Sequence, residues 1–167
     1  MLEMKRVLIS LVAAVLLLGG CALNDYKKLE FKSYDVASIT DFSYAKAAVN
    51  ACVCLDLEVA NPTGSGYELQ SLIATLYTSS GSKFADAVSL QPAVLAPHSD
   101  STVTLTLNTT IYNPLVIALS QKPDFSTMTA DIDATVKSGS FTKQIKKNKL
   151  PLKEFLEKMG DFKIKLD

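Results

Sequence analysis

Strict alternation of apolar and polar residues is the feature that most constrains the fold of this chain. Between residues 49 and 60 apolar side chains occupy every second position, and the positions between them hold Asn50, Cys52, Cys54, Asp56 and Glu58. Successive side chains of a strand point to opposite sides of its sheet, so a period of two indicates a half-buried β-strand. A chain that contains such a segment is expected to build its core from strands.

The dipeptide Asn61-Pro62 ends this alternating segment. Proline cannot donate a hydrogen bond to a strand ladder, and the asparagine side chain can form a turn with its own backbone. We therefore interpret Asn61 and Pro62 as a structural turn and not as a ligand contact.

The same period recurs along most of the chain. Strands are predicted at residues 29–39, 49–60, 67–79, 83–90, 101–109, 128–137 and 140–147. Clusters of Gly, Pro, Ser and Asn separate these segments and supply the turns. About seven strands with turns at this spacing predict an all-β protein with the architecture of a β-sandwich.

Two segments depart from this period and are predicted to be helical. Residues 113–119 form a continuous apolar run with Pro114 near its start, which favours one short inserted helix. Near the end of the chain, residues 151–159 place Leu152, Phe155 and Met159 on one helical face, and Gly160 follows them. This pattern predicts a C-terminal helix.

The N-terminal segment has the features of a signal peptide. Lys5 and Arg6 precede an apolar run of about a dozen residues, which is too short to span a bilayer. The run ends in Leu18-Gly19-Gly20-Cys21, which resembles the lipobox of bacterial lipoproteins. That resemblance implies lipidation of Cys21, whereas the alternative of a core cysteine leaves the basic start unexplained.

These features divide the chain into four parts. Residues 1–20 are predicted to be a lipoprotein signal peptide, 21–28 a lipidated N-terminus and tether, 29–150 a β-sandwich domain, and 151–167 a C-terminal helix and tail. Because Ala22 and not aspartate follows the cysteine, the resemblance implies the outer membrane of a bacterial cell envelope, with the domain facing the periplasm or the medium.

The strand segments also carry a family resemblance. Asn61-Pro62 after a hydrophobic strand, Leu76-Tyr77 in the next one and the alternating Val, Leu and Thr of residues 103–107 resemble the water-stress and hypersensitive-response (WHy) domain of late embryogenesis abundant (LEA) group 2 proteins. The resemblance covers about residues 31–145. It implies a seven-stranded, fibronectin-III or immunoglobulin-like sandwich without a catalytic site, and a role in stress response.

Residue types that carry out chemistry are sparse. His98 is the single histidine and follows a proline in a predicted turn, and no serine lies in a nucleophile motif. Cys52 and Cys54 lie two apart on one strand, near the distance limit for bridging, so we expect free thiols. With Asp56 and Glu58 they form a line too long for a tetrahedral metal site. We therefore expect no enzyme, no metal and no cofactor.

Charge is balanced, with 17 basic and 17 acidic residues, so the overall field does not recruit nucleic acid. Asp131 and Asp133 share a strand face at a spacing that paired-carboxylate hydrolysis would need, but such pairs on a solvent face usually serve solubility. The basic residues gather near the C-terminus at Lys143, Lys146, Lys147, Lys149 and Lys153. They indicate either an edge strand protected from aggregation or a contact with an anionic surface.

Two functional classes fit these features. The first is a lipid-anchored, non-catalytic binding or stress-protective module that engages a protein, glycan or lipid partner. The second is a carrier that holds a lipid or another small apolar ligand inside the sandwich. An internal apolar cavity would favour the carrier, and a filled core would favour the module.

Overall fold

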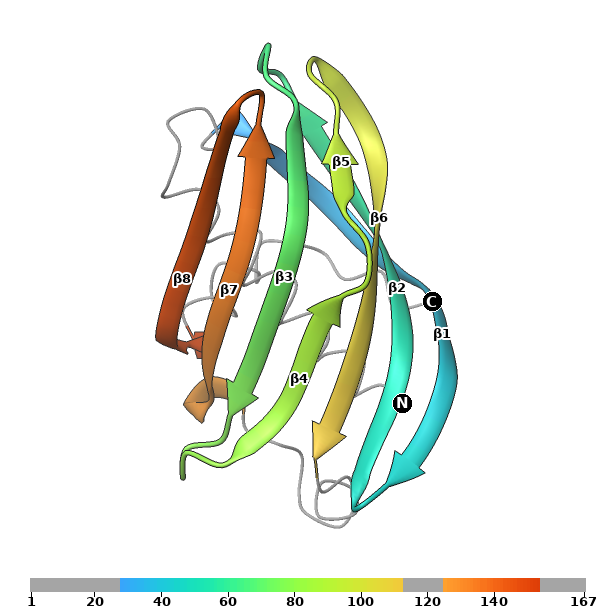
Figure 1. The fold of residues 1–167 in the computed structure, drawn as a ribbon, viewed down its shortest axis with the longest axis vertical. Helices are drawn as coiled ribbons and strands as arrows, with labels where there is room; N and C mark the ends of the chain where they lie inside the picture. Colours follow the sequence, from blue (N-terminus) through green and yellow to red (C-terminus); the bar gives the residue numbers. More distant parts are fainter. Residues whose placement is uncertain (1–27, 113–124, 154–167) are drawn as a thin grey trace.

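The computed structural model describes residues 28–112 and 125–153 (Figure 1). This part of the chain forms eight strands and one 3-10 turn. They are β1 (Glu30–Ala45), β2 (Ala48–Asn61), β3 (Tyr67–Tyr77), β4 (Lys83–Ser89), β5 (Ala93–Leu95), β6 (Ser99–Tyr112), the 3-10 turn η2 (Phe125–Thr127), β7 (Thr129–Ser138) and β8 (Phe141–Pro151). The prediction of an all-β protein is confirmed.

The strands pair antiparallel in the order β1-β2-β6-β4-β3-β7-β8, and β5 pairs with β3. Strand β4 joins the two halves, because it pairs with β6 on one side and with β3 on the other. The sheet curves so that the first part of β1 passes behind β3 (Figure 1). Both halves of this continuous hydrogen-bonded sheet contribute side chains to one core cluster.

The core follows the period of two that the sequence predicts. In β2, Val53, Leu55 and Leu57 are buried while the residues between them are partly accessible. Val53 and Leu55 lie opposite Leu107 and Leu105 of β6. A single cluster joins these side chains to the inner faces of the other half, which contributes Leu72, Ala74 and Leu76 from β3 and Ala130, Ile132 and Ala134 from β7.

The register places the turns at two ends of the sheet. Leu76, Ala85 and Ile111 lie at one level of β3, β4 and β6, so the opposite ends of β3 and β6 also lie together. The upper end in Figure 1 holds the start of β1, the β2–β3 loop, the β5–β6 turn and the β7–β8 turn. The lower end holds the β1–β2 and β3–β4 turns.

The prediction of seven strands missed β5. This strand has three residues and lies in the segment between Pro92 and Pro97, which the sequence indicates as a bend. Strand β4 pairs with β3 from Ile73 to Tyr77. At the other end of β3, β5 pairs with it instead, and Tyr67 lies opposite Leu95. The eighth strand therefore extends the pairing of β3 beyond the reach of β4.

The predicted helices lie almost entirely outside the described residues. The inserted helix at 113–119 is outside them. Pro151 belongs to β8, Leu152 and Lys153 begin a helical turn, and the rest of the predicted C-terminal helix is again outside. The structure therefore does not confirm either helix.

Strands β1 and β8 stand at the two ends of the strand order and are therefore the edges of the described sheet. The register of β1 against β2 shifts at three places, between Phe31 and Ser33, between Val36 and Ser38, and between Thr40 and Ser43. The register between β7 and β8 shifts once, between Ala130 and Ile132, and Lys149 of β8 has a φ of 54°. Both edges are therefore irregular.

Candidate functional site

Asn61 is enclosed at the upper end of the sheet and makes four hydrogen bonds. Its side-chain nitrogen donates to the carbonyl oxygens of Ser65 at 2.8 Å and Ala96 at 2.9 Å. Its side-chain oxygen accepts from the Thr63 backbone N–H at 3.0 Å and from the Thr63 hydroxyl at 2.6 Å. The amide ties the β2–β3 loop to the segment before β6. All of these contacts are internal, as a structural turn requires.

Cys52 and Cys54 lie on the outer face of β2 and are free thiols. In the register, Cys52 lies between Thr40 of β1 and Asn108 of β6, and both cysteines are partly accessible. The Cys54 sulfur lies 3.7 Å from the Thr106 hydroxyl. The two thiols are therefore half-covered by side chains of the neighbouring strands on the same face.

The environment of Cys52 suppresses thiolate formation. Desolvation by the flanking side chains is the largest cause that raises the pKa of this thiol, and Cys54 and Asp41 raise it further. A hydrogen bond with Thr40 acts in the opposite direction. The nucleophile in cysteine chemistry is the thiolate, so this position favours an unreactive thiol.

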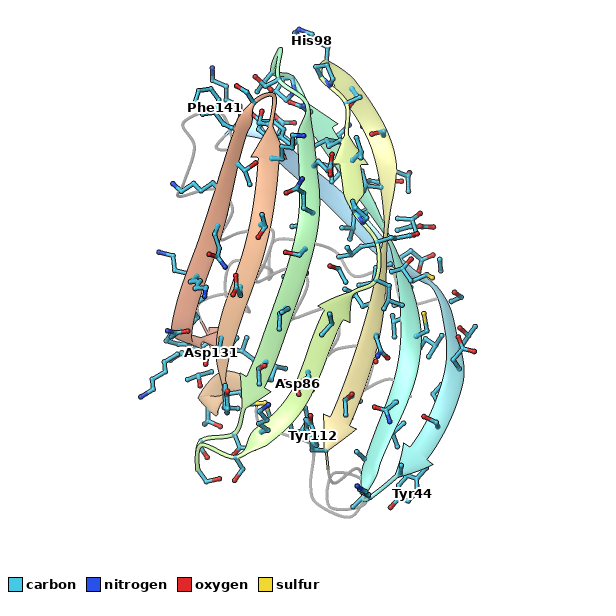
Figure 2. The ribbon with its side chains drawn as sticks, in the orientation of Figure 1. Tyr44, Asp86, His98, Tyr112, Asp131 and Phe141 are labelled. Atoms are coloured by element: carbon cyan, nitrogen blue, oxygen red, sulfur yellow. The ribbon has the colours of Figure 1, made fainter. Side chains whose placement is uncertain are left out.

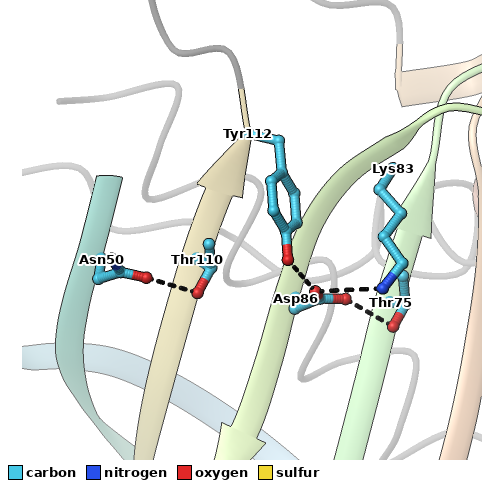
Figure 3. A network of polar contacts seen from close by, with 6 residues as sticks. All are labelled: Asn50, Thr75, Lys83, Asp86, Thr110 and Tyr112. Atoms are coloured by element: carbon cyan, nitrogen blue, oxygen red, sulfur yellow. Dashed lines mark hydrogen bonds and ion pairs between the residues drawn. The ribbon is translucent and has the colours of Figure 1, made fainter. Parts of the chain in front are cut away.

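A row of polar side chains crosses the outer face at the lower part of the sheet (Figure 3). The Thr110 hydroxyl donates to Asn50 at 2.7 Å, and the Thr75 hydroxyl donates to Asp86 at 2.7 Å. Asp86 also receives a 2.5 Å hydrogen bond from the Tyr112 hydroxyl, and the Lys83 amine lies 3.6 Å from it. The row thus joins side chains from β2, β6, β4 and β3, which the sequence period alone does not bring together.

Within this row, Asp86 controls the ionisation of Tyr112. The hydrogen bond to Asp86 is the largest cause that raises the pKa of the tyrosine hydroxyl, followed by desolvation and by the charge of Asp86. Asp86 accepts hydrogen bonds from Thr75 and Tyr112 and forms an ion pair with Lys83, so these contacts connect β3, β4 and β6.

Asp131 and Asp133 each contact β8. Asp131 accepts a 2.8 Å hydrogen bond from the Lys149 backbone N–H, at the irregular part of that strand. Asp133 accepts from the Gln144 side chain at 2.9 Å and lies 3.4 Å from the Lys146 amine. Both carboxylates therefore hold the edge strand in place, and these contacts favour structure over paired-carboxylate catalysis.

His98 lies exposed on the β5–β6 turn at the upper end (Figure 2). Its backbone N–H donates to the Thr63 carbonyl at 2.9 Å, and its φ of 47° is in the left-handed region. Within residues 28–112 and 125–153, no group of three or more His, Cys, Asp and Glu side chains is arranged to hold a metal ion. The same residues include no helix long and apolar enough to cross a bilayer.

Large exposed hydrophobic side chains occur at both ends of the sheet. Phe141, at the β7–β8 turn of the upper end, is 76% exposed. Tyr44, near the β1–β2 turn of the lower end, is 60% exposed (Figure 2). Phe42, two residues before it in β1, is 56% exposed. The alternation of apolar residues does not single out Phe141, whereas the preceding Ser138-Gly139 turn signal places it at a hairpin tip.

The basic residues of the C-terminal region lie where both sequence interpretations would place them. Lys143, Lys146, Lys147 and Lys149 are exposed along the edge strand β8. Lys146 contacts Asp133, as described above. Their position suits protection of an edge, and it also leaves a basic strip along β8.

Comparisons with known proteins give distant likenesses only. No family model matches the chain, and no curated protein sequence matches it. A crystal structure of a protein from Archaeoglobus fulgidus is similar, with 14% identity, a TM-score of 0.39, and coverage of 71% of this chain and 97% of that chain. The structural genomics target SoR45 is similar with 7% identity, a TM-score of 0.40, and coverage of 74% and 84%.

The third similar structure is a late embryogenesis abundant protein solved in solution. It is 14% identical and has a TM-score of 0.31, and the match covers 92% of this chain and 89% of that chain. At these identities and TM-scores no residue role is transferred from any of the three structures.

Proposed function

We propose that this protein is a lipid-anchored, non-catalytic β-sandwich module of the bacterial cell envelope, with a binding or stress-protective role. The observation that carries the proposal is the position of the domain in the chain. Strand β1 begins at Glu30, a few residues after the lipobox-like Leu18-Gly19-Gly20-Cys21. Fatty chains on Cys21 would hold the whole sheet close to a bilayer, and two or three such chains make a stable anchor.

The contacts of the described residues support a binding or protective module over an enzyme. Cys52 is held as a thiol, Asp131 and Asp133 hold β8, and Asn61 is saturated by internal hydrogen bonds. The polar row of the outer face is likewise satisfied by its own members. The resemblance to the WHy domain of LEA group 2 proteins agrees with this role, and it is the basis for proposing a fibronectin-III-like sandwich and a stress response.

The carrier is the alternative, and the packing of the core argues against it. A cavity for an acyl chain would leave accessible space against the side chains that line it. The largest core side chains instead have less than 2% of their surface accessible, namely Leu55, Leu72, Leu76, Leu105, Leu107, Leu152 and Val53. These side chains are enclosed by their neighbours, and this close enclosure supports the module.

The anchor is tested by mass spectrometry and labelling. We expect the mature chain to begin at Cys21 with a diacylglyceryl thioether and to incorporate a palmitate analogue. The Cys21→Ser variant should incorporate none and should leave the membrane fraction. An intact, unmodified N-terminus on the membrane-associated protein would overturn the proposal.

Two further experiments address location and partner. Because Ala22 favours the outer membrane in this proposal, the Ala22→Asp variant should move to the inner membrane fraction while it remains lipidated. Crosslinking of the anchored protein, compared with the soluble Cys21→Ser variant, should recover a partner at the membrane. Extraction of a stoichiometric lipid from the soluble variant would instead favour the carrier.

A further inference from the structure

An aromatic side chain is exposed to solvent at the upper end of the sheet. Phe141 is the most exposed of the large hydrophobic residues in the described part of the chain, and it follows the tight turn between β7 and β8. Gly139 adopts a φ of 59° in that turn. The Ser138 hydroxyl donates a 2.9 Å hydrogen bond to the Gly66 carbonyl, which ties the turn to the β2–β3 loop.

Lysines accompany this aromatic residue. Lys137 and Lys143 lie within two residues of the turn on β7 and β8, and both are exposed. Glu68 of β3 lies opposite Lys137 in the register. The hairpin tip therefore combines an exposed ring with two exposed lysines, a combination that suits the interface of an anionic bilayer.

The tether brings this same end to the membrane. Residues 22–28 span at most about 25 Å when fully extended, and they lead into β1 at the upper end. Strand β1 has 16 residues and is about 50 Å long, so it separates its starting point from Phe42 and Tyr44 near its other end. Of the three exposed aromatic side chains named above, Phe141 therefore lies at the same end of the sheet as the start of β1.

We propose that the β7–β8 turn, with Phe141 at its tip and Lys137 and Lys143 beside it, contacts the surface of the bilayer that holds the lipid on Cys21. The protein then has a defined orientation, with its upper end toward the lipid and its lower end away from it. This inference rests on the proposed lipid anchor and adds a second, non-covalent contact to it.

Fluorescence gives a direct test, because the chain contains no tryptophan. The Phe141→Trp variant, prepared as the full lipidated protein, is reconstituted into vesicles of phosphatidylethanolamine and phosphatidylglycerol. We expect its emission to shift to shorter wavelength and acrylamide quenching to fall about threefold relative to the soluble Cys21→Ser form, because a ring in the interface is shielded from water. Lipids brominated near the headgroup should quench it.

Phe42→Trp is the matched control, since it places the same probe at an exposed aromatic position of the opposite end. Its emission and its acrylamide quenching should be the same with and without the lipid anchor. In the Phe141→Trp background, Lys137→Gln with Lys143→Gln should weaken the shielding on vesicles that contain phosphatidylglycerol. The same pair of changes should have no effect on vesicles of neutral lipid.

The outcomes separate this inference from the anchor itself. Lipidated protein in which the Phe141→Trp probe is as accessible as the Phe42→Trp probe would overturn the orientation and leave the anchor intact. A probe shielded only in the Phe42→Trp variant would show that the opposite end faces the bilayer. Mass spectra of the same preparations that show no lipid on Cys21 would overturn both proposals.

Discussion

The hydroxyl of Tyr112, the last residue of β6, donates a 2.5 Å hydrogen bond to the Asp86 carboxylate in β4. These residues are 26 positions apart in the chain. Their contact joins β6, which belongs to the half with β1 and β2, to β4, which leads to the half with β3, β7 and β8. We expect Tyr112→Phe to lower the free energy of unfolding by about 1 to 2 kcal/mol, because a hydrogen bond to a charged group is lost. Urea unfolding measures the change. Tyr44→Phe, at an exposed ring, should stay within about 0.5 kcal/mol of the parent protein.

The same contact predicts a dependence on alkaline pH. The pKa of Tyr112 is raised in the folded protein, first by the hydrogen bond to Asp86, so the folded state holds this proton more tightly than the unfolded state. Its contribution to stability is therefore present below the unfolded pKa of about 10 and is lost as the pH rises through the higher folded value. The stability difference between the parent protein and Tyr112→Phe should shrink above about pH 10. An equal difference at neutral and strongly alkaline pH would contradict the arrangement.

Cys52 should react slowly with thiol reagents in the folded protein. Its pKa is raised, chiefly by desolvation, so little thiolate is present near neutral pH. In a Cys21→Ser, Cys54→Ser background, Ellman's reagent should modify Cys52 several-fold more slowly in buffer than in urea. The ratio of the rate in urea to the rate in buffer should fall as the pH rises. Asp41→Asn removes a charge that raises this pKa and should speed the reaction. Equal rates in buffer and in urea would show that this face of β2 is uncovered.

Asn61 should be among the polar residues that contribute most to stability. Its side chain is 1% exposed and donates to the Ser65 and Ala96 carbonyls. Asn61→Ala leaves both acceptors without this donor and should lower the free energy of unfolding by about 2 to 3 kcal/mol. Asn61→Asp should cost at least as much, since it places carboxylate oxygen against carbonyl oxygen. Asn108→Ala, on the exposed face of β6, is the control and should change stability by less than about 0.5 kcal/mol.

Leu152 ties the chain after β8 to the core. Its side chain is 0% exposed, and its backbone N–H donates to the Met128 carbonyl at 3.0 Å. Leu152→Ala should lower the free energy of unfolding by about 2 to 5 kcal/mol, the range for a leucine removed from a packed core. Leu90→Ala, at a leucine that is 57% exposed, provides the control and should have a small effect. A small effect of both changes would show that the segment after β8 contributes little to the fold.

The sequence predicts the long regular strands because burial imposes their period. The predicted alternation is reproduced in β2 from Ala51 to Ala60, whereas Val49 is only partly buried, like Asn50. The hairpin of β7 and β8 follows from the Ser138-Gly139 turn. Strand β1 continues to Ala45, beyond its predicted end at residue 39. Its register shifts explain the difference, since each irregularity moves the apolar positions out of phase with a simple period of two.

The remaining features depend on contacts between distant segments. Strand β5 is too short to show a period, and it exists because β3 extends beyond β4. The partners of Asn61 include Ala96, which is 35 positions away, so local turn signals identify the turn but not its full set of hydrogen bonds. The contact between Asp86 and Tyr112 has no local signal, because only the pairing of β4 with β6 brings the two residues together.

The irregular edge strands have a consequence for crowding. The proposed anchor would hold copies of the protein in one leaflet, where they would meet side by side far more often than in solution, and exposed strand edges favour pairing between copies. A regular ladder between two copies needs a straight edge strand. Strand β1 has three register shifts, and β8 has one shift beside Lys149 and a row of lysine ammonium groups, so neither edge is regular enough to pair easily with a second copy. A dense two-dimensional population of this protein can thus remain a set of separate molecules.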